Sequence, residues 1–141
     1  MLNAESIVTN YLIELFKEDS LVNTVIYGIP SDRDLNKSNI FPLVHIMIPT
    51  VNFDGNSIDF QFDVACVDLR DIRDNSNSDK VFGDNLIDSL NTATAVFGKA
   101  LLKLELGNND YNIHLLEHTS LDPVVFSEKN ILDGRQLSIT L

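Results

Sequence analysis

Residues 57–67 read S-I-D-F-Q-F-D-V-A-C-V and alternate between apolar side chains and a second, mostly polar set. Successive side chains of a β-strand point to opposite faces, so this pattern predicts a strand with one face on a hydrophobic core. The other face is left for water or for a partner. The apolar set is Ile58, Phe60, Phe62, Val64 and Cys66, and the second set is Ser57, Asp59, Gln61, Asp63, Ala65 and Val67.

Length and composition predict one folded unit. The chain has 141 residues, of which 44% are hydrophobic and 22% are charged. A chain of this length buries about two thirds of the surface that its unfolded form exposes. We therefore expect a single globular domain over residues 1–141.

The charge balance argues against a nucleic-acid groove. The chain carries 21 acidic and 10 basic residues, a net charge of −11, and the basic residues are scattered along the sequence. Without a basic stripe, such a surface repels phosphates. An acidic surface past which DNA slides remains compatible with this charge.

The only cysteine, Cys66, excludes an internal disulfide, and its place on the apolar face predicts a small buried hydrophobe. The first residues lack the basic start and apolar run of a signal peptide. No apolar segment approaches the roughly 20 residues that span a bilayer. We therefore expect a protein of the cytoplasm that does not contact a membrane.

Apolar residues spaced by three and four predict two amphipathic helices, at about residues 4–18 and 80–106. The tetrapeptide F-D-G-N at residues 53–56 predicts a tight turn into the alternating strand, and thus an antiparallel hairpin. A charged, polar segment predicts an exposed loop at 69–79. The strands are expected at about 24–27, 42–49, 57–68, 111–118 and 131–141.

These elements predict an α+β fold with a single antiparallel or mixed β-sheet of about five strands. Both helices are expected on one face, because two apolar helix faces then cover the one apolar face of the sheet. The opposite face of the sheet is expected to be uncovered.

Two groups of residues have the composition of metal sites but not the required geometry or pattern. His114 and His118 are four apart, which on an extended strand separates them by about 13 Å, too far to share one metal ion. Asp32-x-Asp34-x-Asn36 begins like a calcium loop but lacks the glycine and the glutamate that such a loop requires. We predict no catalytic, cofactor-binding or metal-binding residues and no enzyme activity.

Asp59 and Asp63 share a strand face, and a carboxylate pair can perform acid and base chemistry if burial separates the two pKa values. On a wet sheet face such carboxylates are more commonly only charged. No phosphate loop and no nucleophile with a base and an orienting residue occurs in the sequence.

The order of elements resembles the phage tail-completion and tail-terminator proteins, which join head to tail. Three segments carry the resemblance: F-Q-F-D-V-A-C-V-D at 60–68 after the apolar strand that Phe41-Pro42 opens, S-D-K-V-F-G-D-N-L-I-D-S-L at 78–90, and N-I-L-D-G-R-Q-L-S-I-T-L at 130–141. In the third segment, Asp133-Gly134 is interpreted as a turn that opens the final strand.

The resemblance implies a structural protein of the virion: a ring, typically of six or twelve copies, through which DNA passes without specific binding. Its partners would be other neck, portal or tail proteins. Asp59, Gln61 and Asp63 are the candidate lumen or open sheet face. The alternating charges that could pair with a neighbouring subunit are Asp68, Arg70, Asp71, Arg73 and Asp74.

Two alternatives stay open at this point. The first is a small intracellular adaptor domain that binds other proteins. The second, weaker one is a metal-assisted hydrolase.

Overall fold

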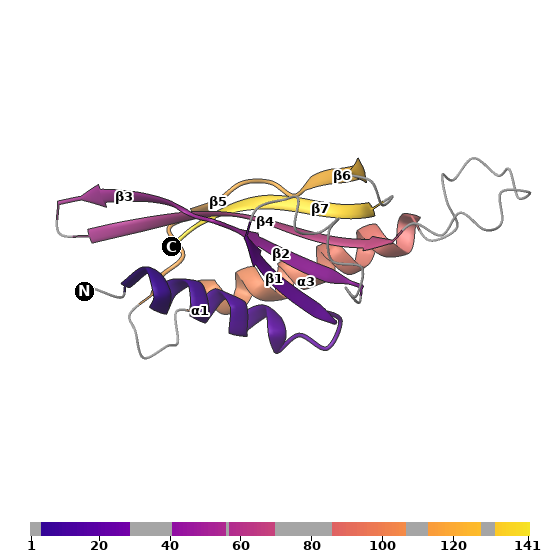
Figure 1. The fold of residues 1–141 in the computed structure, drawn as a ribbon, viewed down its shortest axis with the longest axis horizontal. Helices are drawn as coiled ribbons and strands as arrows, with labels where there is room; N and C mark the ends of the chain where they lie inside the picture. The colour runs from indigo at the N-terminus through magenta and orange to yellow at the C-terminus, as the bar shows by residue number, and fades with distance from the viewer. Residues whose placement is uncertain (1–3, 29–40, 56, 70–85, 107–112, 128–131) are drawn as a thin grey trace, which may run out of the picture.

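The computed structural model describes residues 4–28, 41–55, 57–69, 86–106, 113–127 and 132–141. Within these ranges two helices and seven strands follow one another along the chain (Figure 1). They are α1 (Ala4–Lys17), β1 (Thr24–Gly28), β2 (Leu43–Met47), β3 (Thr50–Asp54), β4 (Ser57–Leu69), α3 (Leu86–Leu106), β5 (Glu117–His118), β6 (Asp122–Ser127) and β7 (Leu132–Thr140).

The seven strands form one mixed sheet in the order β1-β2-β4-β7-β5, with β3 paired to β4 and β6 paired to β7. The β1–β2 pair is parallel, and the other pairs are antiparallel. The fold is therefore α+β, with five main strands and two further edge strands, which confirms the predicted class. The order is not sequential, since the last strand lies beside the fourth.

Both helices lie on the same face of the sheet, as predicted (Figure 1). Their apolar stripes and the apolar residues of β4 form one core, in which Leu12, Phe62 and Phe97 are fully buried. The rings of Phe16 on α1 and Phe97 on α3 meet edge to face, with centroids 6.1 Å apart. This contact joins the two helices over the sheet.

The alternation at residues 57–67 is confirmed on the helix side, where Phe60, Phe62, Val64 and Cys66 are buried. The prediction that the opposite face is uncovered holds only for the first half of β4. Further along, Ala65 and Val67 are buried in a second, smaller cluster together with Leu43. The open part of that face is therefore the part that precedes residue 65.

The predicted strand at 42–49 is wrong in its extent, because β2 ends at Met47 and a separate strand, β3, follows at Thr50. Both strands lie along the same side of β4. Between the pairs Ile46↔Val64 and Thr50↔Gln61, three residues of this segment oppose two of β4, which is the arrangement of a β-bulge. Pro49 lies in this bulge, where its missing N–H breaks no ladder bond.

The predicted hairpin is confirmed, but its turn is shorter than residues 53–56. Phe53 and Asp54 still pair with Ile58 and Ser57, so both belong to β3. Gly55 has a φ of 57°, the left-handed conformation that tight hairpin turns require.

The carboxyl-terminal predictions need three corrections. Of the strand predicted at 111–118, the described part forms a strand only at Glu117 and His118, which are β5; residues 113–116 are irregular, and 111–112 lie outside the described residues. The strand β6 was missed, because Pro123 reads as a strand breaker although an edge strand tolerates it. Asp133-Gly134 is no turn: both residues lie in β7 and pair with Asp68 and Val67 of β4.

The remaining boundaries agree with the predictions to within one or two residues. α1 ends at Lys17, β1 ends at Gly28 and β4 extends through Leu69, one residue into the predicted loop. The start of the helix predicted at about residue 80 and the loop at 70–79 lie outside the described residues.

Candidate functional site: the open polar face of the sheet

Polar side chains from four strands share the sheet face that points away from the helices. In the strand register, Asn52 pairs with Asp59, Gln61 lies between Thr50 and Thr140, and Asp63 pairs with Ser138. Cross-strand partners point to the same side of a sheet, so these residues form one surface. We call it the open polar face: Thr50, Asn52, Asp59, Gln61, Asp63, Glu117, Ser138 and Thr140.

Two of the three residues that the sequence alternation predicted for this face are accessible to solvent. These are Gln61 and Asp63, which are exposed, whereas Asp59 is half-buried. A carboxylate oxygen of Asp63 accepts a hydrogen bond from the hydroxyl of Ser138. The backbone N–H of Ser138 in turn donates to the hydroxyl of Thr119, at 2.9 Å, so that Ser138 is fixed from both sides.

The open polar face is acidic. Asp59, Asp63 and Glu117 contribute three carboxylates, and no lysine, arginine or histidine belongs to the face as defined above. Four residues of extended strand place Asp59 and Asp63 about 13 Å apart, too far to share a proton or a metal ion. The geometry favours a surface that repels anions or receives a basic partner over a catalytic carboxylate pair.

The same sheet face is closed at the β1–β2 end. His45 is fully buried there, and its Nε2 lies 2.9 Å from the carbonyl oxygen of Gly28. Its partner in the register is Ala65, so His45 points to the same side of the sheet as the open polar face, although its side chain is buried. A buried, hydrogen-bonded histidine of this kind is a structural residue rather than an exposed ligand.

Of the five residues predicted to form a subunit interface, the structure describes one. Asp68 is half-buried in β4 and pairs with Asp133 of β7, which is fully buried. Arg70, Asp71, Arg73 and Asp74 lie outside the described residues. Sequence reasoning missed Asp133 as a buried carboxylate, since an Asp-Gly pair has the same local signature as a turn.

The two histidines considered above as metal ligands are not brought together. His118 lies in β5, where its Nδ1 is 2.8 Å from the carbonyl oxygen of Thr119, and His114 lies in the irregular segment before that strand. Within the described residues, no group of three or more His, Cys, Asp or Glu side chains is placed to hold a metal ion. Asp32, Asp34 and Asn36 lie outside those residues.

Burial raises the pKa of the Cys66 thiol to about 12, and the charges of Asp68 and Asp19 act in the same direction. The ordinary pKa of a cysteine thiol is 9.0, so at pH 9.0 this thiol is half ionised in the unfolded chain but neutral in the folded protein. Between pH 9 and pH 12 the native state binds more protons than the unfolded state, so stability falls as the pH rises. This agrees with the predicted role of Cys66 as a buried hydrophobe.

We expect this thiol to make the protein steeply alkali-sensitive. The free energy of unfolding should fall by up to about 1.4 kcal/mol per pH unit above pH 9 on account of Cys66 alone. Urea titrations at pH 7, 9 and 10.5, on the wild type and on Cys66→Ala, measure this, because every other group titrates in both proteins. If the difference in stability between the two proteins were independent of pH, the buried thiol would not be the cause.

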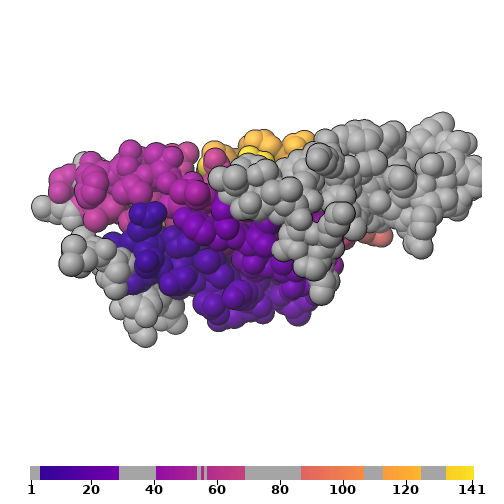
Figure 2. All heavy atoms as spheres, viewed as in Figure 1, coloured from indigo at the N-terminus to yellow at the C-terminus, as the bar shows by residue number. Residues whose placement is uncertain are grey.

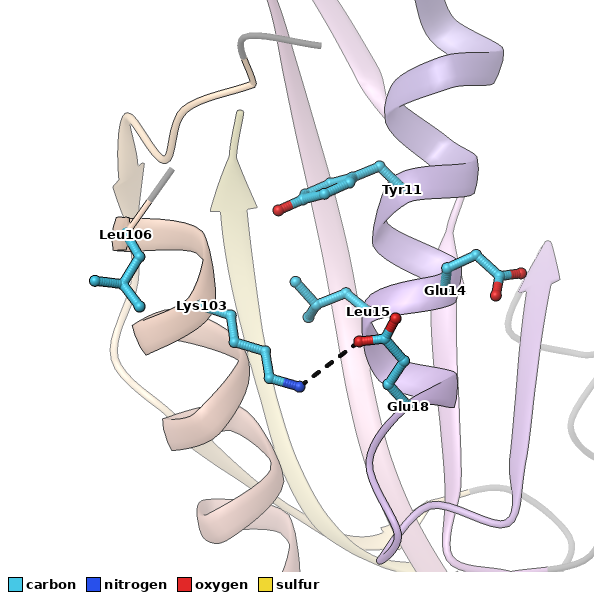
Figure 3. A pocket seen from close by; sticks show the side chains of 6 residues that line it. All are labelled: Tyr11, Glu14, Leu15, Glu18, Lys103 and Leu106. Carbon is cyan, nitrogen blue, oxygen red and sulfur yellow. Dashed lines mark ion pairs between the residues drawn. The ribbon is translucent and has the colours of Figure 1, made fainter. Parts of the chain in front are cut away.

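A groove between the two helices is one hollow of the described surface (Figure 3). It measures about 360 Å³, and its lining comes from both helices: Tyr11, Glu14, Leu15 and Glu18 of α1, and Lys103 and Leu106 of α3. The amino group of Lys103 reaches across the groove to Glu18, at 3.9 Å, but both side chains are exposed, by 46% and 70%. Exposed pairs add little stability. None of the described residues that line the groove is a buried polar side chain, so they do not form a built ligand site.

No helix among the described residues is both long enough and apolar enough to cross a bilayer. No protein-family model matches this sequence, and no curated protein matches it significantly.

Proposed function

We propose that this chain is a structural protein of a phage virion: a ring-forming subunit of the head-to-tail connector or tail terminator, through which DNA passes. The observation that carries the proposal is the open polar face, which presents three carboxylates from β4 and β5 on the side of the sheet opposite both helices. The resemblance of the element order to tail-completion proteins supports the same role. The proposal includes no enzyme activity and no cofactor.

An acidic wall suits a passage for DNA. Phosphates are repelled by carboxylates within about 10 Å at 0.1 M salt, the distance over which such charges act. Repulsion keeps a layer of water between the wall and the duplex, so the strand does not stick as it moves. The net charge of −11 extends this effect over the whole subunit.

A closed ring needs two different surfaces that meet head to tail. The alternating charges of Asp68, Arg70, Asp71, Arg73 and Asp74 are the proposed contribution of one subunit to this contact. Such pairs set register and the choice of partner more than affinity. Other neck, portal or tail proteins would stack on the ring, and the protein would reside in the virion after assembly in the host cytoplasm.

The first test is the mass of the full chain in solution, by light scattering after size exclusion, with electron microscopy of the same fractions. We expect closed rings of six or twelve copies, alone or when portal and tail-tube proteins of the same virus are added. A protein that stays monomeric under all of these conditions would contradict the ring. Binding to an unrelated protein as a monomer would favour the adaptor class.

A second measurement tests the lumen directly. Asp59→Lys with Asp63→Lys should turn the open polar face basic and give the ring an affinity for duplex DNA at low salt, measured by fluorescence anisotropy. The matched control is Glu14→Lys with Glu105→Lys, which makes the same change in charge on exposed positions of the two helices. Equal DNA binding by both variants would show that the sheet face does not line the passage.

A further inference from the structure

The β3–β4 hairpin exposes a large aromatic side chain near its turn. Phe53 is 81% exposed, more than any other large hydrophobic side chain among the described residues. The hairpin extends to one end of the molecule, past the start of α1 (Figures 1 and 2). An aromatic ring in this position contributes nothing to the core and is available to a partner.

The backbone of the hairpin is also available. β3 pairs with β4 on one side, and none of the described residues pairs with its other edge. An unpaired edge presents a row of N–H and C=O groups that another strand can join. Edges are commonly protected by a lysine, an internal proline or a bulge, but T-V-N-F-D has neither residue, and the bulge at Pro49 precedes it.

The two sides of β3 specify the side chains that an added strand would need. On the helix side, Val51 and Phe53 continue the apolar face, and Val51 already packs against the core. On the other side, Thr50 and Asn52 are polar and exposed, and Asp59 lies behind Asn52 on β4. An added strand would lie about 10 Å from β4, within the reach of a lysine or arginine directed at Asp59.

We propose that the outer edge of β3 accepts an extended segment of another protein, whose side chains alternate between apolar and basic. Its apolar side chains pack on Phe53 and Val51, and its basic side chains extend over Asn52 toward Asp59. Backbone hydrogen bonds give the affinity, and this alternation gives the specificity.

Charge complementarity favours such a segment over a second copy of this chain. Each lysine that the structure describes lies on a helix, near a carboxylate of its own chain: Lys17 at 3.8 Å from Glu14, Lys99 at 3.7 Å from Asp19 and Lys103 at 3.9 Å from Glu18. None of the three therefore lies in an edge strand that could pair with β3 of a second copy. Arg135, the one described arginine, extends to the carbonyl oxygen of Leu121. A second copy would bring a further net charge of −11 to an edge that lies beside an acidic face.

The probe is a fluorescent seven-residue peptide that alternates valine and lysine, titrated with the full-length protein and followed by anisotropy. We expect saturable binding that weakens as salt is added. The peptide that alternates valine and glutamate should not bind. A valine–lysine peptide with an N-methyl group on every second residue should also fail, because it cannot pair along the edge.

Two variants locate the site. Phe53→Ser should weaken binding of the lysine peptide about tenfold, since a large exposed apolar contact is lost. Asp59→Asn should weaken it less and reduce its salt dependence. Leu106→Ser, which removes an apolar side chain of similar exposure from α3, is the control and should bind like the wild type.

The inference stands apart from the ring, since peptide binding is measured whatever the number of copies. It would be overturned if the lysine and glutamate peptides bound equally, if Phe53→Ser bound like Leu106→Ser, or if neither peptide bound. It would also be overturned if the wild-type protein self-associated and the Phe53→Ser variant did not, because the edge of β3 would then bind a second copy.

Discussion

Replacement of Gly134 by alanine is expected to abolish the native fold or to destabilise it by more than about 4 kcal/mol. Gly134 is buried in β7 and pairs with Val67 of β4 and Val124 of β6. A Cβ at this position would collide with the carbonyl oxygen of Cys66 and come within 2.8 Å of the Cys66 carbonyl carbon and 2.9 Å of the Val67 Cα. All three atoms are backbone, so no rotamer change relieves the clash.

The measurement is urea unfolding followed by circular dichroism, with Gly98→Ala as the matched control. Gly98 lies in α3, and a Cβ there meets nothing within 4 Å. The same substitution should stabilise the protein at that site, by about 0.5–1 kcal/mol, because alanine is the better helix former. If the free energy of unfolding of Gly134→Ala lay within about 1 kcal/mol of the wild-type value, the backbones of β4 and β7 would not approach each other closely at Gly134. That result would contradict the pairing of Gly134 with Val67.

Gly134 also shows where local sequence signals fail. Asp-Gly is a common turn sequence, and it predicted a turn that opens the last strand. The glycine is needed for a different reason, the close approach of two backbones in the centre of the sheet. A turn and a close approach of two backbones can therefore use the same Asp-Gly sequence. The two roles are distinguished only by the strand with which the glycine pairs.

The elements that could be predicted are those with a long periodic pattern. α1, α3 and β4 were found because their apolar residues repeat over many positions and are buried on one side. β3 and β6 were missed because each is short and lies at or next to a proline. The position of β7 between β4 and β5 could not be predicted, since pairing between distant strands leaves no local pattern.

The open polar face shows the same division. Asp59, Gln61 and Asp63 were predicted because they alternate within one strand. Glu117, Ser138 and Asn52 complete the face from other strands, and their positions depend on the register. A side-chain period of two places residues on a face only after the neighbouring strands are known.

Phe97→Ala is the core substitution with the largest expected effect, about 3–5 kcal/mol of lost stability. Phe97 is fully buried in α3, and its ring meets Phe16 of α1 edge to face. Removing the ring leaves a cavity between both helices and the sheet. The folded state then loses the transfer free energy of the ring and the contacts of the atoms around it. The measurement is the free energy of unfolding in urea.

Phe53→Ala is the matched control, because the same side chain is removed from a position that is 81% exposed, and the change should stay within about 0.5 kcal/mol. A double-mutant cycle with Phe16→Ala should give a coupling of about 0.5–1.5 kcal/mol for the ring pair. Equal losses from Phe97→Ala and Phe53→Ala would mean that α3 does not pack on the sheet through this ring. The assignment of one sheet face to the helices and the other to the open polar face would then lose its basis, since that assignment depends on which side of β4 the helices bury.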